Sequence, residues 1–222
     1  MNIINRLVYQ LFRPLVNYKL SIKEDARLSK KEVALTASHL ANLKVVPDRE
    51  ALLNHLPKGG TVVEVGVAEG EFSDMILKTT LPDKLVLVDL WDSPSPMYGP
   101  EALCAIESRH ADSISAERIE IRRGTSWDQL SLLPKESVDW LYLDAAHDYD
   151  SVKKDLEASL VSLRPNGLIC GHDYIRWARG PARYGVVEAV GEFMLDRGFE
   201  MLYMTHEQNQ HLSFAIRRMK TS

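Results

Sequence analysis

Acidic and imidazole side chains follow two consecutive apolar runs in the second half of the chain. Asp144 and His147 come after the run 138–143, and His172 and Asp173 come after the run 168–171. Ligands of open parallel sheets bind beyond the carboxyl ends of the strands, so we expect Asp144, His172 and Asp173 to converge at one rim. Two carboxylates and an imidazole suit a divalent cation such as Mg²⁺ or Mn²⁺. A hydrogen-bonded polar rim without a metal is the alternative.

A glycine-rich stretch, TVVEVGVAEG at 61–70, supplies a second set of functional residues. Its β-branched start predicts a buried strand, and a helical pattern begins at Glu71. Gly66 and Gly70 permit a tight turn and a close approach of a ligand to the backbone. Glu64 precedes this turn. The spacing E-x-G-x-A-x-G differs from the G-x-G-x-x-G of dinucleotide-binding dehydrogenases.

Further candidates for ligand contacts follow the next two strands. Asp89 closes the apolar run 85–88, about twenty residues after the glycine turn, where an acid commonly accepts hydrogen bonds from ribose hydroxyls. The position of Trp91 is consistent either with a contact that covers a bound cofactor or with packing at the edge of the sheet, where the side chain would act as a plug. Ser126 follows the strand at 118–122 and suits either a contact with a nucleobase or a helix cap.

These residues require a parallel sheet with crossover helices to position them. Strand patterns alternate with helical ones, which predicts an α/β fold. The seven predicted strands begin at Thr61 and are followed by the segments 85–89, 118–122, 138–143, 168–171, 199–205 and 211–217. The last two read as a terminal hairpin. The loop 92–100, with three prolines, is long enough to border a pocket.

The first fifty-seven residues are predicted to form a helical extension to a cofactor-binding domain at 58–222. Apolar residues at 3, 4, 7, 8, 11, 12 and 15 form one helical stripe, which Pro14 should end or kink. Three uses remain open: packing on the domain or on a second subunit, a lid over the site, or a basic helix on a membrane surface.

The glycine stretch, Asp89 and the two polar clusters together resemble class I S-adenosylmethionine-dependent methyltransferases. The segment 139–174 resembles the branch of metal-dependent small-molecule O-methyltransferases that includes enzymes acting on antibiotic sugars. The likeness covers about residues 58–218. It departs from the family at Ala68, where Gly is more frequent, at Thr125, where an acid is usual, and at Ala146, where the branch often has an acid proposed as general base.

The resemblance implies a Rossmann-like methyltransferase sheet of seven strands with S-adenosylmethionine as cofactor. Glu64, Gly66 and Gly70 would hold its amino-acid end, and the residues Asp89, Trp91 and Ser126 would contact its ribose and adenine side. Asp144, His172 and Asp173 would hold a cation that binds the acceptor hydroxyl.

Because Ala146 stands where the branch has its acid, His147 or Asp148 would have to replace it. His147 is the expected general base, because an imidazole titrates near neutral pH. The loop 174–185 contains three arginines. They are equally consistent with binding of an anionic or polyhydroxylated acceptor and with a loop that is simply solvated by its charges.

The whole-chain composition limits the partners. Lys+Arg 27 against Asp+Glu 31 leaves a net charge of −4, which disfavours nucleic acid. No apolar run reaches the length of a membrane span, and two separated cysteines do not suggest disulfides or a zinc site, so we expect a cytoplasmic protein. A small hydroxylated molecule is the expected substrate, and homo-oligomer formation is left open.

Two other functions are consistent with the same motifs. A nucleotide-binding oxidoreductase would bind NAD, which the glycine spacing disfavours. A non-catalytic protein could retain the fold, since a fold does not secure a function. Cofactor binding without methyl transfer to any hydroxylated acceptor would favour that second alternative.

Overall fold

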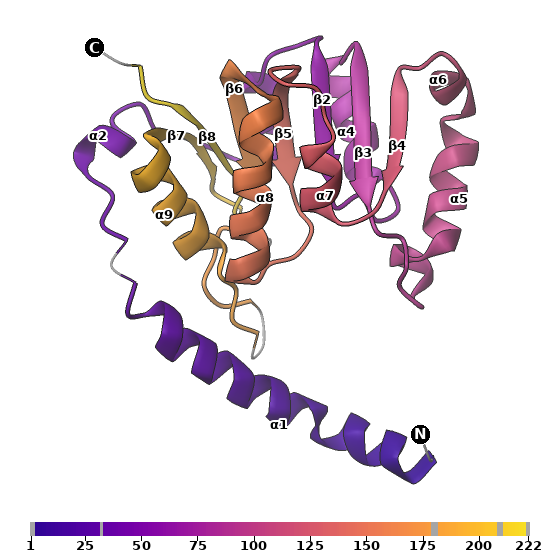
Figure 1. Ribbon diagram of the computed structural model, residues 1–222, viewed down its shortest axis with the longest axis vertical. Coiled ribbons are helices and arrows are strands. Elements are labelled where there is room, and N and C mark those ends of the chain that lie inside the picture. The colour runs from indigo at the N-terminus through magenta and orange to yellow at the C-terminus, as the bar shows by residue number, and fades with distance from the viewer. Residues whose placement is uncertain (1–2, 32, 179–181, 208–210, 221–222) are drawn as a thin grey trace.

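The computed structural model describes residues 3–31, 33–178, 182–207 and 211–220, and these form an α/β sheet domain with one long N-terminal helix (Figure 1). The strands are β1 (Lys44–Val46), β2 (Thr61–Val65), β3 (Lys84–Asp89), β4 (Ile119–Arg123), β5 (Val138–Leu143), β6 (Leu163–Gly171), β7 (Phe199–Thr205) and β8 (Phe214–Arg218). The helices are α1 (Ile3–Leu28), α2 (Ala37–Leu40), α3 (Arg49–His55), α4 (Glu71–Thr80), η1 (Pro96–Tyr98), α5 (Pro100–Arg109), α6 (Ala111–Ser115), α7 (Ser126–Ser131), α8 (Tyr149–Ser162) and α9 (Val186–Arg197).

The eight strands form one mixed sheet in the order β1-β7-β8-β6-β5-β2-β3-β4. All neighbouring pairs are parallel except those of β8, which runs antiparallel to both β6 and β7. The predicted α/β class, the Rossmann-like arrangement and the terminal antiparallel hairpin are therefore confirmed. The predicted number of strands is wrong by one, because β1 lies in the stretch that we expected to be helical.

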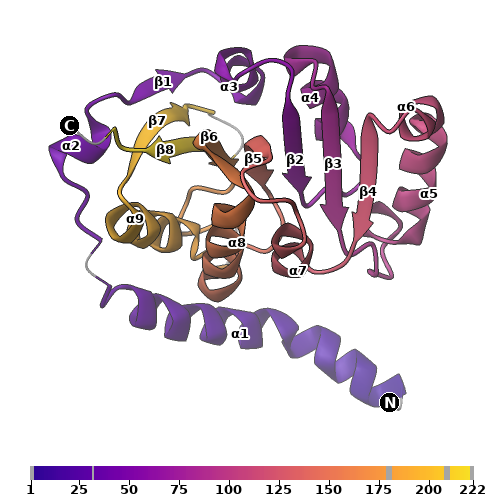
Figure 2. The same ribbon diagram turned by 45° about the horizontal axis from the view of Figure 1, so that its top comes forward.

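The two faces of the sheet carry separate apolar cores. Figure 2 shows α7, α8 and α9 on one face and α3 and α4 on the other. Along β2, β3 and β5, side chains alternate between these cores. Val63 belongs to the core that contains Leu156 and Val190, whereas Val62 belongs to the core that contains Leu52 and Ile76. Strands buried on both faces need continuous apolar runs, which explains why the alternation is invisible in the sequence.

The N-terminal region differs from the expectation in three places. α1 continues through Pro14 to Leu28, and in the rest of the expected helical extension the helices are the short α2 and α3. β1 pairs in parallel with β7, and α3 packs on α4, so residues 44–55 are part of the sheet domain. The boundary expected between residues 57 and 58 thus falls inside the folded domain.

The connections locate the functional site. The chain passes from β2 through β3 to β4 on one side, and then returns to β5 on the other side of β2. In open α/β sheets the ligand crevice lies at such a switch point, outside the carboxyl ends of the strands. β2 ends at Val65 and β5 at Leu143, so the residues that follow them, Gly66 and Asp144, lie at this point.

Candidate active site

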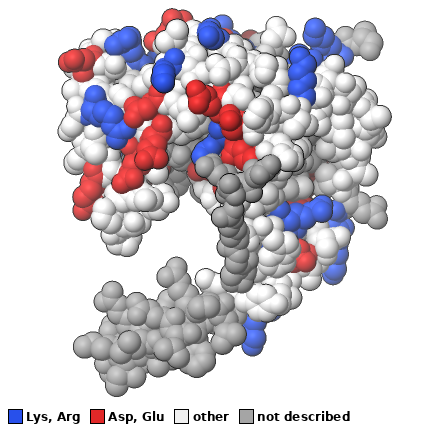
Figure 3. Space-filling model, turned by 180° about the vertical axis from the view of Figure 1, so that it is seen from behind, with Lys and Arg blue, Asp and Glu red and all other residues white. Residues whose placement is uncertain are grey.

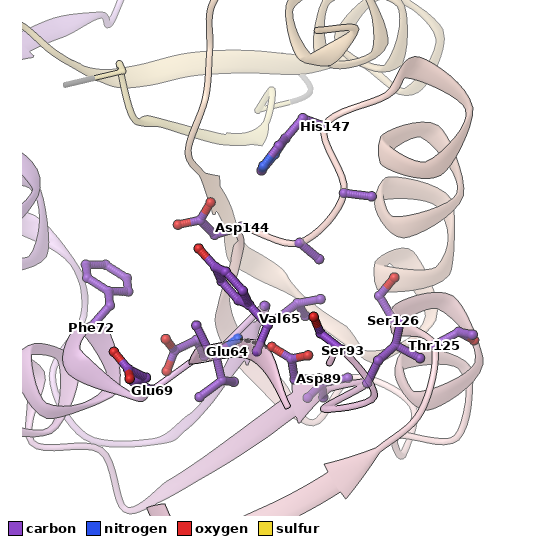
Figure 4. Close-up of a pocket in the computed structure, with 18 of the residues that line it drawn as sticks. Glu64, Val65, Glu69, Phe72, Asp89, Ser93, Thr125, Ser126, Asp144 and His147 are labelled. Carbon is purple, nitrogen blue, oxygen red and sulfur yellow. Dashed lines mark hydrogen bonds between the residues drawn. The ribbon is translucent and has the colours of Figure 1, made fainter. Parts of the chain in front are cut away.

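A cavity of about 720 Å³ opens at the switch point (Figure 4). Its walls come from the glycine turn after β2, the end of β3, the loop that contains η1, the start of α7 and the turn after β5. The site residues predicted from the sequence that line it are Glu64, Gly66, Asp89, Ser126, Asp144 and His147. The loop 92–100 borders the cavity as expected, through Asp92, Ser93, Met97 and Tyr98.

Gly66 allows the chain that leaves β2 to pass close to the backbone that follows β5. Its φ of +87° lies in the left-handed region, and a Cβ at this position would come within 2.2 Å of the Asp144 backbone oxygen. Only glycine fits both constraints. Gly70 also has a positive φ and precedes α4, but it is buried behind the turn and does not line the cavity.

Asp89 holds the glycine turn from the end of β3. Its Oδ2 accepts hydrogen bonds from the backbone N–H groups of Val67 and Ala68 at 2.7 and 3.0 Å, and its Oδ1 accepts one from Trp91 at 3.2 Å. The carboxylate therefore shapes the turn and also forms part of the cavity wall.

Trp91 supports the turn from outside the cavity. Its side chain is fully buried, and its indole N–H donates to the Ala68 carbonyl at 3.1 Å. Trp91 is not among the described residues that line the cavity. Of the two uses expected from the sequence, the structure fits the plug, and the contact with a cofactor has no geometric support.

Glu64 is a buried acid in the cavity wall. It lies on β2 with 1% of its surface exposed, and the Ser73 hydroxyl donates a hydrogen bond to it at 2.5 Å. Burial raises its pKa to about 8, the hydrogen bond opposes this, and the nearby carboxylates of Asp144 and Asp89 raise it further. A cation beside Glu64 would reverse the shift.

Ser126 begins α7 and is fixed by a second buried acid. Its hydroxyl donates to Asp155 of α8. Burial raises the pKa of Asp155 to about 6, although the Ser126 hydrogen bond opposes the rise. Thr125, at the position where the family usually has an acid, also lines the cavity and donates to Asp128 at 2.5 Å.

Three imidazoles surround the carboxylate of Asp173. The Asp173 Oδ2 lies 3.0 Å from Nδ1 of His147, and its Oδ1 lies 3.5 Å from Nδ1 of His172 and in contact with His211. Asp144 joins this cluster, because its Oδ1 lies 3.6 Å from Nδ1 of His172. The predicted convergence at one rim is therefore present, with Asp144 and His147 on the cavity wall and His172 and Asp173 behind them.

The charges within this cluster stabilise one another. Burial alone would raise the pKa of Asp173, but hydrogen bonds with His147, His172 and His211 outweigh burial and hold the pKa far below its usual value. Burial would lower the pKa of His172, but the carboxylates of Asp144 and Asp173 raise it to about 9. Burial would also lower the pKa of His147, but its hydrogen bond to Asp173 and the charge of that carboxylate raise the pKa.

The cavity lining is strongly acidic. Its carboxyl groups belong to Glu64, Glu69, Glu71, Asp89, Asp92 and Asp144, whereas Arg49 is the one Lys or Arg among the described lining residues. Arg49 lies 3.7 Å from Asp144 and over the ring of Phe72. Such a lining favours a cationic ligand and disfavours the pyrophosphate of a dinucleotide.

Several residues of the site have no signal in the sequence. Arg49 and Phe72 line the cavity from α3 and α4, and His211 reaches Asp173 from the loop between β7 and β8. Tyr184 stacks on His147 with ring centroids 4.7 Å apart. All four depend on contacts between distant segments, and no local pattern marks them.

Two of the three arginines of the loop 174–185 are paired with acidic side chains of the protein itself. The Arg183 side chain is 1% exposed and is paired with Glu188 at 2.7 Å and with Asp25 of α1 at 2.6 Å. Arg176 is paired with Glu188 at 2.9 Å. The third arginine, Arg179, lies outside the described residues.

The chain is similar to known methyltransferases in sequence pattern and in fold. A family model described as a methyltransferase domain matches residues 63–174, which is half of the chain. No curated protein sequence matches. The pyocyanin biosynthetic protein PhzM is similar in structure, with a TM-score of 0.54 and 15% identity over 73% of this chain, which spans about half (51%) of PhzM.

Two smaller proteins are similar over most of their length. An rRNA methylase from Streptococcus thermophilus has a TM-score of 0.56 and 15% identity over 77% of this chain and 94% of its own. A SAM-dependent methyltransferase from Aquifex aeolicus has a TM-score of 0.54 and 17% identity, over 86% and 96%. At these identities the structural likeness shows the fold.

The family match spans the glycine turn, Asp89, Ser126 and both polar clusters, which are the segments that build the cavity. The chain belongs to the methyltransferase domain family and is an S-adenosylmethionine-dependent methyltransferase.

Proposed function

We propose that this enzyme methylates a hydroxyl group of a small polyhydroxylated acceptor, such as a sugar, with the assistance of a divalent cation. The observation that carries the proposal is the continuity of the acidic cavity with the Asp144–Asp173 cluster. One site thus offers a space for a cationic cofactor beside groups that can bind and deprotonate a hydroxyl.

The cofactor would occupy the acidic cavity. S-adenosylmethionine carries an ammonium group and a sulfonium that supplies an electrophilic methyl group. Glu64 and the backbone of the turn at Gly66 would hold the amino-acid end, with Gly70 shaping the turn from behind. Asp89 would accept hydrogen bonds from the ribose, and Ser126 would lie on the adenine side.

A divalent cation fits the polar cluster in its donor atoms. Asp144 and Asp173 offer hard oxygens, and His172 offers an imidazole whose Nδ1 lies 3.6 and 3.5 Å from these carboxylates. Donor atoms of Asp144, His147 and Asp173 also lie within 4.8 Å of one another, so His147 is a competing ligand. A bound cation lowers the pKa of a hydroxyl and fixes the position of its oxygen.

His147 is proposed as the general base. Asp173 orients its ring through Nδ1 at 3.0 Å, and Tyr184 stacks on it, so His147 is held beside the cavity in one orientation. Asp144 lies on the same cavity wall as His147 and would hold the cation that binds the acceptor hydroxyl. The protein then contributes alignment of acceptor and cofactor, exclusion of water and removal of one proton.

A small acceptor is favoured over a nucleic acid by the distribution of charge. The net charge is −4, and the cavity lining is acidic. On the face seen in Figure 3, acidic and basic side chains are interspersed, and the described residues form no continuous basic surface there. A phosphate backbone requires such a surface.

The first experiment measures the thermal stability of the protein with S-adenosylhomocysteine, NAD, Mg²⁺ and Mn²⁺, alone and combined. A ligand at about a hundred times its Kd stabilises the fold by roughly 2.7 kcal/mol. We expect a shift with S-adenosylhomocysteine that increases with the cation. Asp144→Asn should abolish the increase, whereas the exposed acid control Asp196→Asn should preserve it.

The second experiment follows transfer of a labelled methyl group to a panel of sugars, phenols and RNA. Transfer to sugars that needs the cation and is lost in Asp144→Asn is the expected result. His172→Ala and His147→Ala distinguish the roles of the two imidazoles. The variant that loses cation binding identifies the histidine that coordinates the cation. Transfer to RNA alone, or a response to NAD in place of S-adenosylhomocysteine, would refute the proposed function.

A further inference from the structure

The first part of α1 is basic and amphipathic. Residues 1–23 contain Arg6, Arg13, Lys19 and Lys23 and no Asp or Glu, although acids outnumber bases in the chain as a whole. The apolar spacing of its sequence, described above, continues into Tyr18 and Ile22. A helix with one apolar stripe and only positive charges is typical of helices that lie in the interface of a membrane with anionic lipids.

The second part of α1 is fastened to the sheet domain. Asp25 pairs with the buried Arg183 at 2.6 Å, and Arg27 pairs with Asp150 at 3.1 Å. Just beyond the helix, Lys31 pairs with Glu192 of α9 at 3.0 Å. These contacts fix one side of the helix and leave another side free.

The part of α1 before Asp25 exposes apolar side chains. Val16, Tyr18, Leu20 and Ile22 are 48%, 49%, 57% and 46% exposed, and Lys19 and Lys23 between and beside them are exposed too. Exposed apolar residues are ordinary when they are scattered. In an α-helix, Tyr18 and Ile22 lie one turn apart on one face with Lys19 and Lys23 beside them, whereas Val16 and Leu20 lie on another face. The face with Tyr18, Ile22 and the two lysines favours an apolar and anionic partner.

The helix lies on the functional side of the molecule. In Figures 1 and 2, α1 runs across the edge of the sheet toward which the strand arrows of β2, β3 and β4 point. That edge holds the cavity. A flat surface in contact with the free side of α1 would therefore lie below the mouth of the active site.

We propose that α1 binds the surface of a membrane that contains anionic lipids, with Tyr18 and Ile22 in the interface and Lys19 and Lys23 at the headgroups. A second copy of the chain is the competing occupant. Charge disfavours it, because pairing α1 with α1 would bring four basic residues against four others with no acid in the segment to neutralise them. Membrane contact would also present the active site to acceptors anchored at that surface.

The test is co-flotation of the full chain with vesicles of phosphatidylcholine alone and of phosphatidylcholine with 30% phosphatidylglycerol. We expect binding to the anionic vesicles only, weakened by 0.5 M NaCl. Lys19→Ser/Lys23→Ser should lower the partition coefficient roughly 25-fold, since each basic residue near an anionic surface contributes a factor of about five. Tyr18→Ser/Ile22→Ser should lower it as well.

A matched control and a second measurement keep the test decisive. Leu132→Ser/Lys135→Ser removes one exposed apolar and one exposed basic residue at the C-terminal end of α7, at the other edge of the sheet, and should leave binding unchanged. Thermal unfolding checks that each variant is folded. Absence of vesicle binding, or equal binding by all variants, would overturn the proposal. A dimer in light scattering that Tyr18→Ser/Ile22→Ser dissociates would assign the surface to a second copy instead.

Discussion

The substitution Glu64→Gln tests whether the buried carboxylate of Glu64 binds the ammonium group of the cofactor. With a pKa of about 8, Glu64 is mostly protonated at neutral pH in the free protein, and a bound ammonium group would require its ionised form. Binding should therefore release a proton and strengthen as the pH rises. From the ionised fractions at pH 6 and pH 7.5, the affinity for S-adenosylhomocysteine should increase about 25-fold between these values.

Isothermal titration calorimetry in two buffers of different ionisation enthalpy measures both quantities. The wild type should release about 0.9 proton at pH 7. Glu64→Gln keeps a hydrogen-bond acceptor for Ser73 but carries no charge, so its binding should be weaker by roughly tenfold or more and independent of pH. Glu71→Gln, an exposed acid of the same cavity, is the control that should retain the pH dependence. Proton release that persists in Glu64→Gln would refute the reasoning.

The same group affects stability with a defined sign. The pKa of Glu64 is higher in the folded state than in the unfolded chain, so the folded state binds more protons and loses stability as the pH rises. From a usual value near 4.5 to about 8, the loss between pH 4.5 and pH 8 is about 4 kcal/mol. Urea unfolding should show this decline in the wild type without ligand and its absence in Glu64→Gln.

Two further substitutions test the packing around the site. Gly66→Ala should destabilise the fold by about 3 kcal/mol or more and abolish S-adenosylhomocysteine binding, because the added Cβ would clash with the Asp144 carbonyl. The control is Gly198→Ala, where φ is similar at +68° but no atom lies within 4 Å of the added Cβ. This variant should lose only about 1 kcal/mol of unfolding free energy in urea. Arg183→Met should lower the free energy of unfolding by about 3–5 kcal/mol, because it leaves Glu188 buried without its main partner. The double variant Arg183→Met/Glu188→Gln should recover much of this stability. If the effects of the two substitutions were simply additive, the pairing would be contradicted.

Much of the fold could be predicted from local patterns, and the exceptions have physical causes. The central strands are continuous apolar runs ended by acids or glycine, a signal that needs no information about distant segments. β1 is only three residues long, and Val45 is exposed at the edge of the sheet, so it lacks the apolar pattern of a strand. It exists because β7 offers an unpaired edge, which no local pattern reveals.

The site could be predicted as far as topology determines it. Asp144, His172 and Asp173 were expected to converge because parallel strands end at a common edge, and they do so. The involvement of His211 could not be predicted, because it depends on how the β7–β8 hairpin folds back onto Asp173. Trp91 was ambiguous in the sequence because a large aromatic residue after a strand suits both a ligand contact and a buried plug.

The three backbone hydrogen bonds that Asp89 accepts have a consequence for how its substitution is interpreted. The turn after β2 already has its shape before any cofactor binds, so binding there requires little ordering of the chain. Replacing Asp89 by Ala would remove a contact with the ribose and also release this turn. The measured loss of affinity would combine both effects, and only a cofactor analogue without the ribose hydroxyls, tested on the intact turn, would separate them.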